Sequence, residues 1–92
     1  MKCKNPATEE EFFVQETSLQ ELKEIFYSLK EYQPTWSDTP LKERIQYISK
    51  FSEELKKREQ HCAEILTKEM GKPLHESVNE IRGAISRIKF FL

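Results

Sequence analysis

The sequence predicts a mainly α-helical fold, in which a short N-terminal β-hairpin precedes about four helices that form a helical bundle. Apolar side chains recur at steps of three and four from residue 18 to the end, as in helices with one buried face. The composition, 34% charged and 37% apolar, is typical of a helix-rich chain with a modest core. We expect a single domain over 1–92, with a strand and turn segment at 1–16 and a helical segment at 18–92.

The strand and turn segment is expected to be a hairpin. Asn5 and Pro6 favour a turn, because proline fixes its own φ and an asparagine before it initiates turns readily. The run Glu11–Gln15, EFFVQ, follows this turn and is rich in strand-forming residues. An isolated two-stranded hairpin is marginal in water, so we expect it to pack against another element.

The first helix is expected to begin with a capping box and to run to about Tyr32. The Ser18 hydroxyl can accept a hydrogen bond from the Glu21 amide, while the Glu21 carboxylate accepts one from the Ser18 amide. Pro34 is expected to stop this helix. Trp36, in the linker that follows, is expected to fill a gap between helices. The apolar face comprises Leu19, Leu22, Ile25, Phe26 and Leu29.

The second helix is expected to begin at Thr39 and Pro40, which suit the N-cap and the first helical position. Arg44 falls at the edge of its apolar stripe, and two interpretations stay open. Its stem can cover apolar surface while the guanidinium reaches water, or it can be partly buried and paired with a carboxylate such as Glu69. The stripe comprises Leu41, Ile45, Ile48, Phe51, Ser52 and Leu55, and the charged far side is expected to be solvated.

A third helix is expected from about Glu59 to Met70. Gly71 follows its last apolar residue, where a left-handed residue commonly ends a helix, and Pro73 prevents continuation. A glycine followed by Lys72 also suggests a phosphate-binding loop. That loop requires GxxxxGK[ST] after a strand, which this sequence does not have. The stretch EMGKP is therefore interpreted as a helix stop.

The fourth helix is expected from about Leu74 to the end of the chain. Phe90 lies on the side opposite its stripe, above Gly83, and no C-capping residue follows. A lone exposed phenylalanine is common, but the missing stop signal favours a truncated domain or a partner that covers a second face. The stripe comprises Leu74, Val78, Ile81, Ala84, Ile85, Ile88, Phe91 and Leu92.

Charge and cysteine usage limit the function classes. A formal net charge of -1 argues against nucleic acid or an anionic membrane as the main partner. The N-terminus lacks the apolar core of a secretory signal, so we expect a cytoplasmic location. Cys3 and Cys62 have no CxxC spacing and are interpreted as reduced thiols, with Cys62 in the core. His61 and His75 do not cluster with acids, so we predict no catalytic, cofactor-binding or metal-binding residue in this chain.

Several short motifs occur together in one order along the chain. They are NPAT at residues 5–8, Trp36, TPLKER at residues 39–44, and LTKEMGKPLHESVNEI at residues 66–81. In this order they resemble the N-terminal segment of the aldehyde dehydrogenase superfamily, closest to the succinate-semialdehyde dehydrogenase branch. The resemblance extends from about residue 5 to residue 92. Each motif is weak alone, and together in register they are fairly specific.

The resemblance implies the N-terminal part of the aldehyde dehydrogenase fold. Family enzymes oxidise an aldehyde to an acid with NAD or NADP, using a cysteine thiolate nucleophile and a glutamate that activates water. The resemblance places these groups and the nucleotide-binding sheet beyond residue 92, so the chain would be a single truncated domain that holds no cofactor. Neither Cys3 nor Cys62 matches the family nucleophile. Helices severed from the cofactor domain would expose apolar faces, which favours a homo-oligomer or association with the missing remainder.

Three functional hypotheses stay open. The chain can be an N-terminal fragment of an aldehyde dehydrogenase that is inactive alone. It can instead be a helical self-association or interaction module derived from that family, binding itself or a full-length relative. A small enzyme using Cys62 or Cys3 is the third hypothesis, and it requires a reactive thiol of low pKa.

Overall fold

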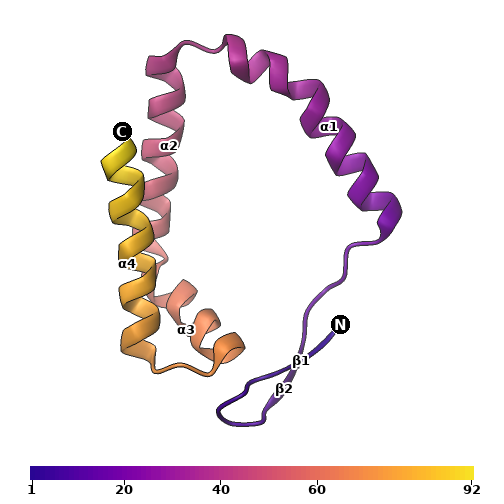
Figure 1. The fold of residues 1–92 in the computed structure, drawn as a ribbon, viewed down its shortest axis with the longest axis vertical. Helices are drawn as coiled ribbons and strands as arrows, with labels where there is room; N and C mark the ends of the chain where they lie inside the picture. The colour runs from indigo at the N-terminus through magenta and orange to yellow at the C-terminus, as the bar shows by residue number, and fades with distance from the viewer.

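Two short antiparallel strands and four helices make up the computed structural model, which describes all residues 1–92 (Figure 1). The mainly helical fold with an N-terminal hairpin is thereby confirmed. The strands are β1, Lys2–Lys4, and β2, Glu11–Phe13. The helices are α1, Leu19–Asp38; α2, Leu41–Lys57; α3, Glu59–Met70; and α4, Leu74–Phe91.

The hairpin forms around the predicted turn. Cys3 lies opposite Phe12 in the antiparallel register. The buried Asn5 caps the turn, because its Oδ1 accepts hydrogen bonds from the amides of Ala7 at 2.8 Å and Thr8 at 3.3 Å. The second strand ends at Phe13, two residues before the end of the strand-forming run. The short side-chain amide thus fixes the turn that joins the two strands.

Helix α1 begins as predicted and ends later than predicted. Both hydrogen bonds of the capping box between Ser18 and Glu21 are present. The prediction that Pro34 stops the helix is wrong, because α1 continues through Pro34 to Asp38 and includes Trp36. A proline lacks one amide donor but still leaves its own carbonyl free to accept. The last turn then closes at Thr39, whose amide donates to the carbonyls of Thr35 and Trp36, each at 3.1 Å.

The start of α2 also corrects the sequence analysis. Thr39 was expected to cap α2, but its hydroxyl instead donates to the carbonyl of Thr35 at 2.8 Å and so belongs to the end of α1. Pro40 occupies the N-cap position of α2, and no side chain caps this helix. The third helix has the predicted limits, and Gly71 ends it with φ of 72°, in the left-handed region.

Helices α2, α3 and α4 pack against one another, with α3 joined to α4 by a tight turn (Figure 1). Their small core contains Ala63 and Ile85, and it includes the buried hydroxyls of Ser52 and Ser77. The Ser77 hydroxyl is 2.8 Å from the Thr67 hydroxyl, so this polar pair joins α4 to α3. The expected bundle is therefore formed by three helices.

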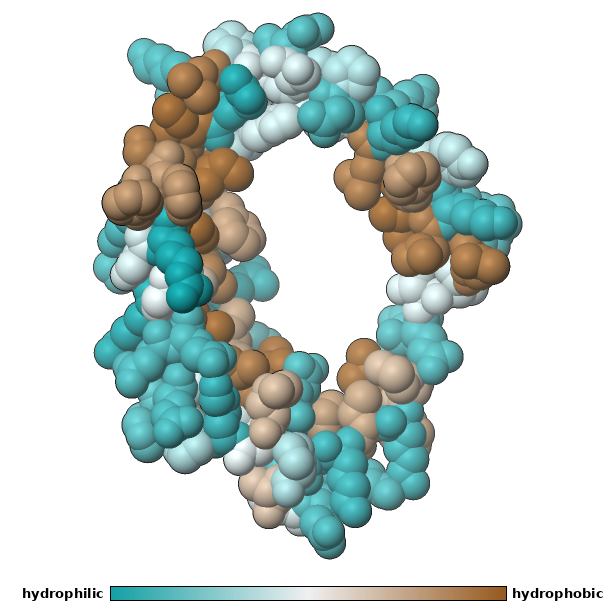
Figure 2. Space-filling view, in the orientation of Figure 1, coloured by the Kyte–Doolittle hydropathy of each residue, from teal (hydrophilic) through white to brown (hydrophobic).

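Helix α1 stands apart from that three-helix bundle. It diverges from α2 and leaves an opening between α1 and the other helices (Figures 1 and 2). The radius of gyration is 17.0 Å, whereas a compact chain of this length has about 12 Å. The accessible surface is 7824 Å², compared with about 5,600 Å² for a compact protein of 11.0 kDa. The chain as folded here leaves much apolar surface uncovered.

Candidate functional site

The residues that carry chemistry are dispersed over the fold. Cys3 lies in β1 and Cys62 in α3, and both are free, half-buried thiols. No group of three or more His, Cys, Asp or Glu side chains is placed to hold a metal ion. No helix is both long enough and apolar enough to span a membrane.

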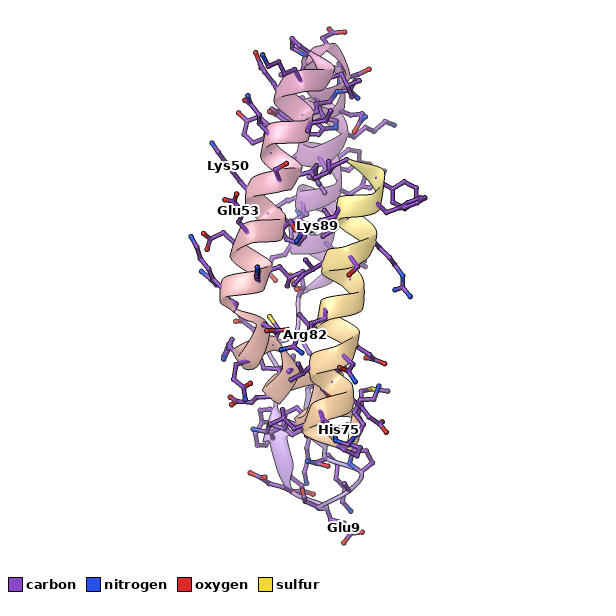
Figure 3. All side chains as sticks on the ribbon, turned by 90° about the vertical axis from the view of Figure 1, so that its left-hand side faces the viewer. Glu9, Lys50, Glu53, His75, Arg82 and Lys89 are labelled. Atoms are coloured by element: carbon purple, nitrogen blue, oxygen red, sulfur yellow. The ribbon has the colours of Figure 1, made fainter.

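Charged side chains cover the outer faces of the three-helix bundle. Lys50 and Glu53 project from α2, and Arg82 and Lys89 from α4 (Figure 3). Arg82 forms an ion pair with Glu59 of α3, which links two helices across their exposed side. Such exposed pairs contribute little to stability. The prediction of a solvated charged face is confirmed, and nothing here resembles a catalytic cluster.

A second exposed pair on α2 perturbs both of its members. Lys57 donates a hydrogen bond to Glu54 at 2.9 Å, three residues earlier. This bond holds the pKa of the Glu54 carboxyl below its usual value and raises the pKa of the Lys57 ammonium. Both groups are fully exposed and lie on the solvated face. The shifts therefore reflect a surface ion pair and do not indicate a functional site.

Gly71 has a second role that the sequence analysis missed. Its amide donates to the Thr67 carbonyl at 2.8 Å, which completes the end of α3. The hairpin turn also lies against it, since a Cβ on Gly71 would be 2.7 Å from Pro6 Cγ and 2.9 Å from the Ala7 nitrogen. Only glycine allows both the left-handed φ and this close approach. The sequence signal for this contact is that an isolated two-stranded hairpin needs another element to pack against.

The rest of the EMGKP stretch strengthens this docking point. The Lys68 ammonium lies over the Phe12 ring, 4.8 Å from its centroid, and so connects α3 to β2. Lys72 pairs with Glu80 in the second turn of α4. The lysine that suggested a phosphate loop is thus held by a carboxylate, and the stretch joins hairpin, α3 and α4.

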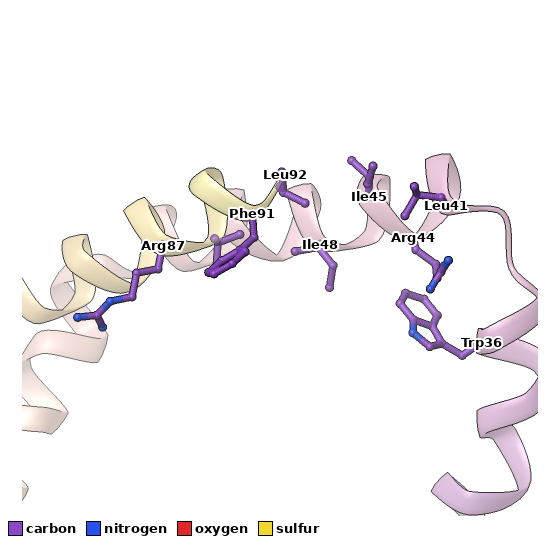
Figure 4. A pocket seen from close by; sticks show the side chains of 9 residues that line it. Trp36, Leu41, Arg44, Ile45, Ile48, Arg87, Phe91 and Leu92 are labelled. Carbon is purple, nitrogen blue, oxygen red and sulfur yellow. The ribbon is translucent and has the colours of Figure 1, made fainter.

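Two exposed apolar areas lie on the surface of the fold. We call the first the α1 stripe; its five members are all more than half exposed, and they are Leu19, Leu22, Ile25, Phe26 and Leu29. We call the second the α2–α4 groove, an open hollow of about 440 Å³ (Figure 4). It is lined by Trp36, Leu41, Arg44, Ile45, Ile48, Arg87, Ile88, Phe91 and Leu92. Apolar atoms gather at both areas, on opposite sides of the opening (Figure 2).

Arg44 is the polar centre of the α2–α4 groove. Its guanidinium lies beside the Trp36 ring (Figure 4), and Trp36 in turn packs against Tyr47 with ring centroids 5.9 Å apart. Arg44 forms no ion pair, so the suggested pairing with Glu69 is not formed. Its Nε is buried and has no hydrogen-bond partner. A buried donor without a partner is costly.

Comparison with known proteins gives the family of this chain. The whole chain, residues 1–92, matches the profile of the aldehyde dehydrogenase family. The chain belongs to the aldehyde dehydrogenase family. The family resemblance carried by NPAT, Trp36, TPLKER and EMGKP is therefore confirmed. No solved structure gives a significant match to the chain.

Relatives from several branches of the aldehyde dehydrogenase family align with most of the chain. A 3,6-anhydro-alpha-L-galactose dehydrogenase of Vibrio sp. (strain EJY3) is 29% identical over 94% of this chain and 18% of its own length. An NADP-dependent glyceraldehyde-3-phosphate dehydrogenase of Pisum sativum is 35% identical over 84% of this chain and 16% of its own. An N-succinylglutamate 5-semialdehyde dehydrogenase of Novosphingobium aromaticivorans is 27% identical over 75% of this chain and 15% of its own length. The chain thus spans less than a fifth of these relatives.

Proposed function

We propose that this chain is the N-terminal segment of an NAD(P)-dependent aldehyde dehydrogenase and is inactive alone. Joined to the remainder of the enzyme, it would contribute to the oxidation of an aldehyde to its acid. The aldehyde would be a semialdehyde such as succinate semialdehyde. The nucleophilic cysteine, the general-base glutamate and the NAD or NADP site would lie in that remainder. We also propose that the enzyme acts in the cytoplasm.

The excess of uncovered surface carries this proposal. The α1 stripe and the α2–α4 groove expose side chains that each favour burial by roughly 1.5–3 kcal/mol. A contiguous apolar area of this kind usually marks an interface. A segment that packs against a larger cofactor domain requires such faces, whereas a self-contained enzyme of 92 residues does not.

Reconstitution tests the proposal. The pure chain is assayed for NADH or NADPH formation with succinate semialdehyde. The same assay is run after the chain is co-expressed with a relative from which the matching N-terminal segment has been removed. We expect no turnover from the chain alone and turnover from the co-expressed pair. The intact relative serves as the positive control. Turnover by the pure chain, or a pair that associates and stays inactive, would contradict the proposal.

The two thiols provide a matched control for the same assay. Cys3→Ser and Cys62→Ser are each introduced into the chain before co-expression. Because the nucleophile is proposed to lie in the remainder, both variants should restore turnover to within about twofold of the unmodified pair. Loss of kcat with unchanged association would instead support the third hypothesis, a nucleophilic thiol in this chain.

Self-association is the second candidate function, and one observation favours it. The chain carries two separate apolar areas, one on a lone helix and one on a helix pair. A second copy can therefore provide a cover for each. Sedimentation at high micromolar concentration tests this candidate, and a strictly monomeric mass near 11.0 kDa would exclude it.

A further inference from the structure

Helix α1 and the α2–α4 groove are comparable in length. The α1 stripe extends over residues 19–29, about 16 Å of helix, and the groove is lined by residues 41–48 of α2 and 87–92 at the end of α4, about 12 and 9 Å of helix. A groove between two helices accommodates a third helix through the ridges and grooves of their side chains. The α1 stripe is one continuous apolar face, as a helix in such a groove requires.

In the structure, α1 does not occupy the groove of its own chain, and only its Trp36 lines that groove. At one end, only Thr39 and Pro40 separate α1 from α2. At the other end, a short linker ties α1 to the hairpin, which is docked on Gly71 between α3 and α4. The chain thus runs around the opening with α1 held on its far side (Figures 1 and 2). Docking α1 on its own α2 and α4 would require the hairpin to leave Gly71.

Charges on the two elements are complementary. Helix α1 has four acidic residues and two lysines, whereas α2 and α4 together have eight basic and five acidic residues. The only charged residues that line the groove are Arg44 and Arg87. The guanidinium groups of Arg44 and Arg87 can donate hydrogen bonds to the carboxylates of an acidic helix. Opposite net charges favour α1 over a basic helix as the occupant.

The uncovered area is also large enough for a stable dimer. The accessible surface exceeds that of a compact 11.0 kDa protein by roughly 2,200 Å². Two copies that each cover this excess would bury about 4,400 Å² in total, within the range of obligate dimers. An exchange in which each of two copies offers one helix and one groove closes at two chains when it is reciprocal.

We propose that α1 of one copy occupies the α2–α4 groove of a second copy, and that the second copy reciprocates. This inference rests on the self-association candidate and specifies its partner and its two contact surfaces. In the dimer, the α1 stripe lies on Leu41, Ile45, Ile48 and Ile88, and Arg44 faces the acidic helix of the partner. Each groove is then covered by α1 of the other copy.

Sedimentation of two matched variants tests whether the α1 stripe forms the dimer contact. Phe26→Lys places a charge in the α1 stripe, and Phe13→Lys makes the same change at an exposed position of β2. We expect a dimer for the unmodified chain, a similar dimer for Phe13→Lys, and at least about 100-fold weaker dimerisation for Phe26→Lys, since each dimer loses two buried rings. Circular dichroism of the two variants and the unmodified chain, at equal chain concentration, should show the same helix content. Equal weakening by both variants would overturn the proposal.

Cross-linking tests the pairing itself. Single-cysteine chains are made in a Cys3→Ser, Cys62→Ser background, one with Phe26→Cys and one, carrying a mass tag, with Ile48→Cys. A short bismaleimide should link the mixed chains at least about tenfold faster than either chain alone. Fastest linkage within Phe26→Cys alone would overturn the proposal in favour of α1 pairing with α1. A dimeric mass without the mixed product overturns this inference and leaves self-association standing, whereas a monomeric mass overturns both.

Discussion

Gly71 is the residue on which the hairpin docking depends most directly. Its φ of 72° lies in the left-handed region, and a Cβ would be 2.7 Å from Pro6 Cγ. Gly71→Ala should therefore lower the free energy of unfolding by about 1–2 kcal/mol through the backbone alone. Contact with the Ala7 backbone should add to this cost and displace the hairpin. Chemical denaturation measures the loss, and amide chemical shifts of residues 2–13 report the displacement.

Gly83 provides the matched control for that substitution. It lies inside α4, and a Cβ there would meet no atom within 4 Å. Gly83→Ala should raise the free energy of unfolding by about 1 kcal/mol, because alanine favours a helix interior over glycine. The same change at the two glycines is thus expected to act in opposite directions. Equal effects would show that Gly71 is not a docking point.

Sequence reasoning found one role of Gly71 and missed the other for a physical reason. The helix stop is a local property, since the left-handed residue and the proline two positions later are neighbours in the chain. The contact with Pro6 joins residues 65 positions apart and depends on where the hairpin lies. Similarly, no local pattern shows that the Arg44 Nε is buried without a partner. At Gly71 the local backbone role was predictable, whereas the surroundings of Gly71 and Arg44 in the folded chain were not.

At the scale of the element, the capping box sets the start of α1 and makes it sensitive to acid. Two hydrogen bonds with Ser18 hold the pKa of the Glu21 carboxyl below its usual value. The bond from the Ser18 backbone amide has the larger effect, and the bond with the Ser18 hydroxyl has the smaller one. A carboxyl whose pKa is lower in the folded state stabilises the fold above its unfolded pKa. That contribution is lost as the pH falls through the folded pKa. Helix α1 should therefore lose helicity as the pH falls below the usual pKa of a glutamate carboxyl.

Two variants separate the parts of this cap. Ser18→Ala should destabilise α1 by about 1 kcal/mol at neutral pH, because one helix amide loses its acceptor. It should also move the pKa of Glu21 part of the way back to its usual value, since the backbone hydrogen bond remains. Glu21→Gln should remove the acid dependence of α1 instead. Carboxyl chemical shifts and circular dichroism against pH measure both, and an unchanged Glu21 titration in Ser18→Ala would contradict the hydroxyl contribution.

The ends of the helices show which signals act locally. The third helix has the limits that its sequence indicates, because Gly71 and Pro73 act on the same turn. The boundary between α1 and α2 was mispredicted because two signals compete there. Thr39 can cap α2 or close α1, and its hydroxyl hydrogen-bonds to the Thr35 carbonyl of α1. Pro34 weakens a helix without ending it when the following carbonyls and amides stay paired.

At the scale of the whole molecule, the sequence predicted four amphipathic helices but not which of them pack together. The apolar stripe of each helix is readable from its periodicity, whereas the partner of each stripe is not. The stripes of α2 and α4 are only partly satisfied by each other, and the α1 stripe is covered by nothing in the chain. The chain spans 15–18% of the length of the family relatives it was compared with.

Hydrogen exchange tests this division of the molecule. Segments that lack packing partners open with low free energies, so the amides of α1 should exchange fastest among the four helices. The amides of α3 and of the adjoining turns of α4 should be the most protected, because they surround Ala63, Ser77 and Ile85. Protection of α1 should rise with protein concentration as the second copy covers it, while that of α3 changes little. Mass spectrometry of peptides from 19–38 and 59–70 across a concentration series provides the measurement. An α1 that is fully protected at the lowest concentration would show that it packs within its own chain.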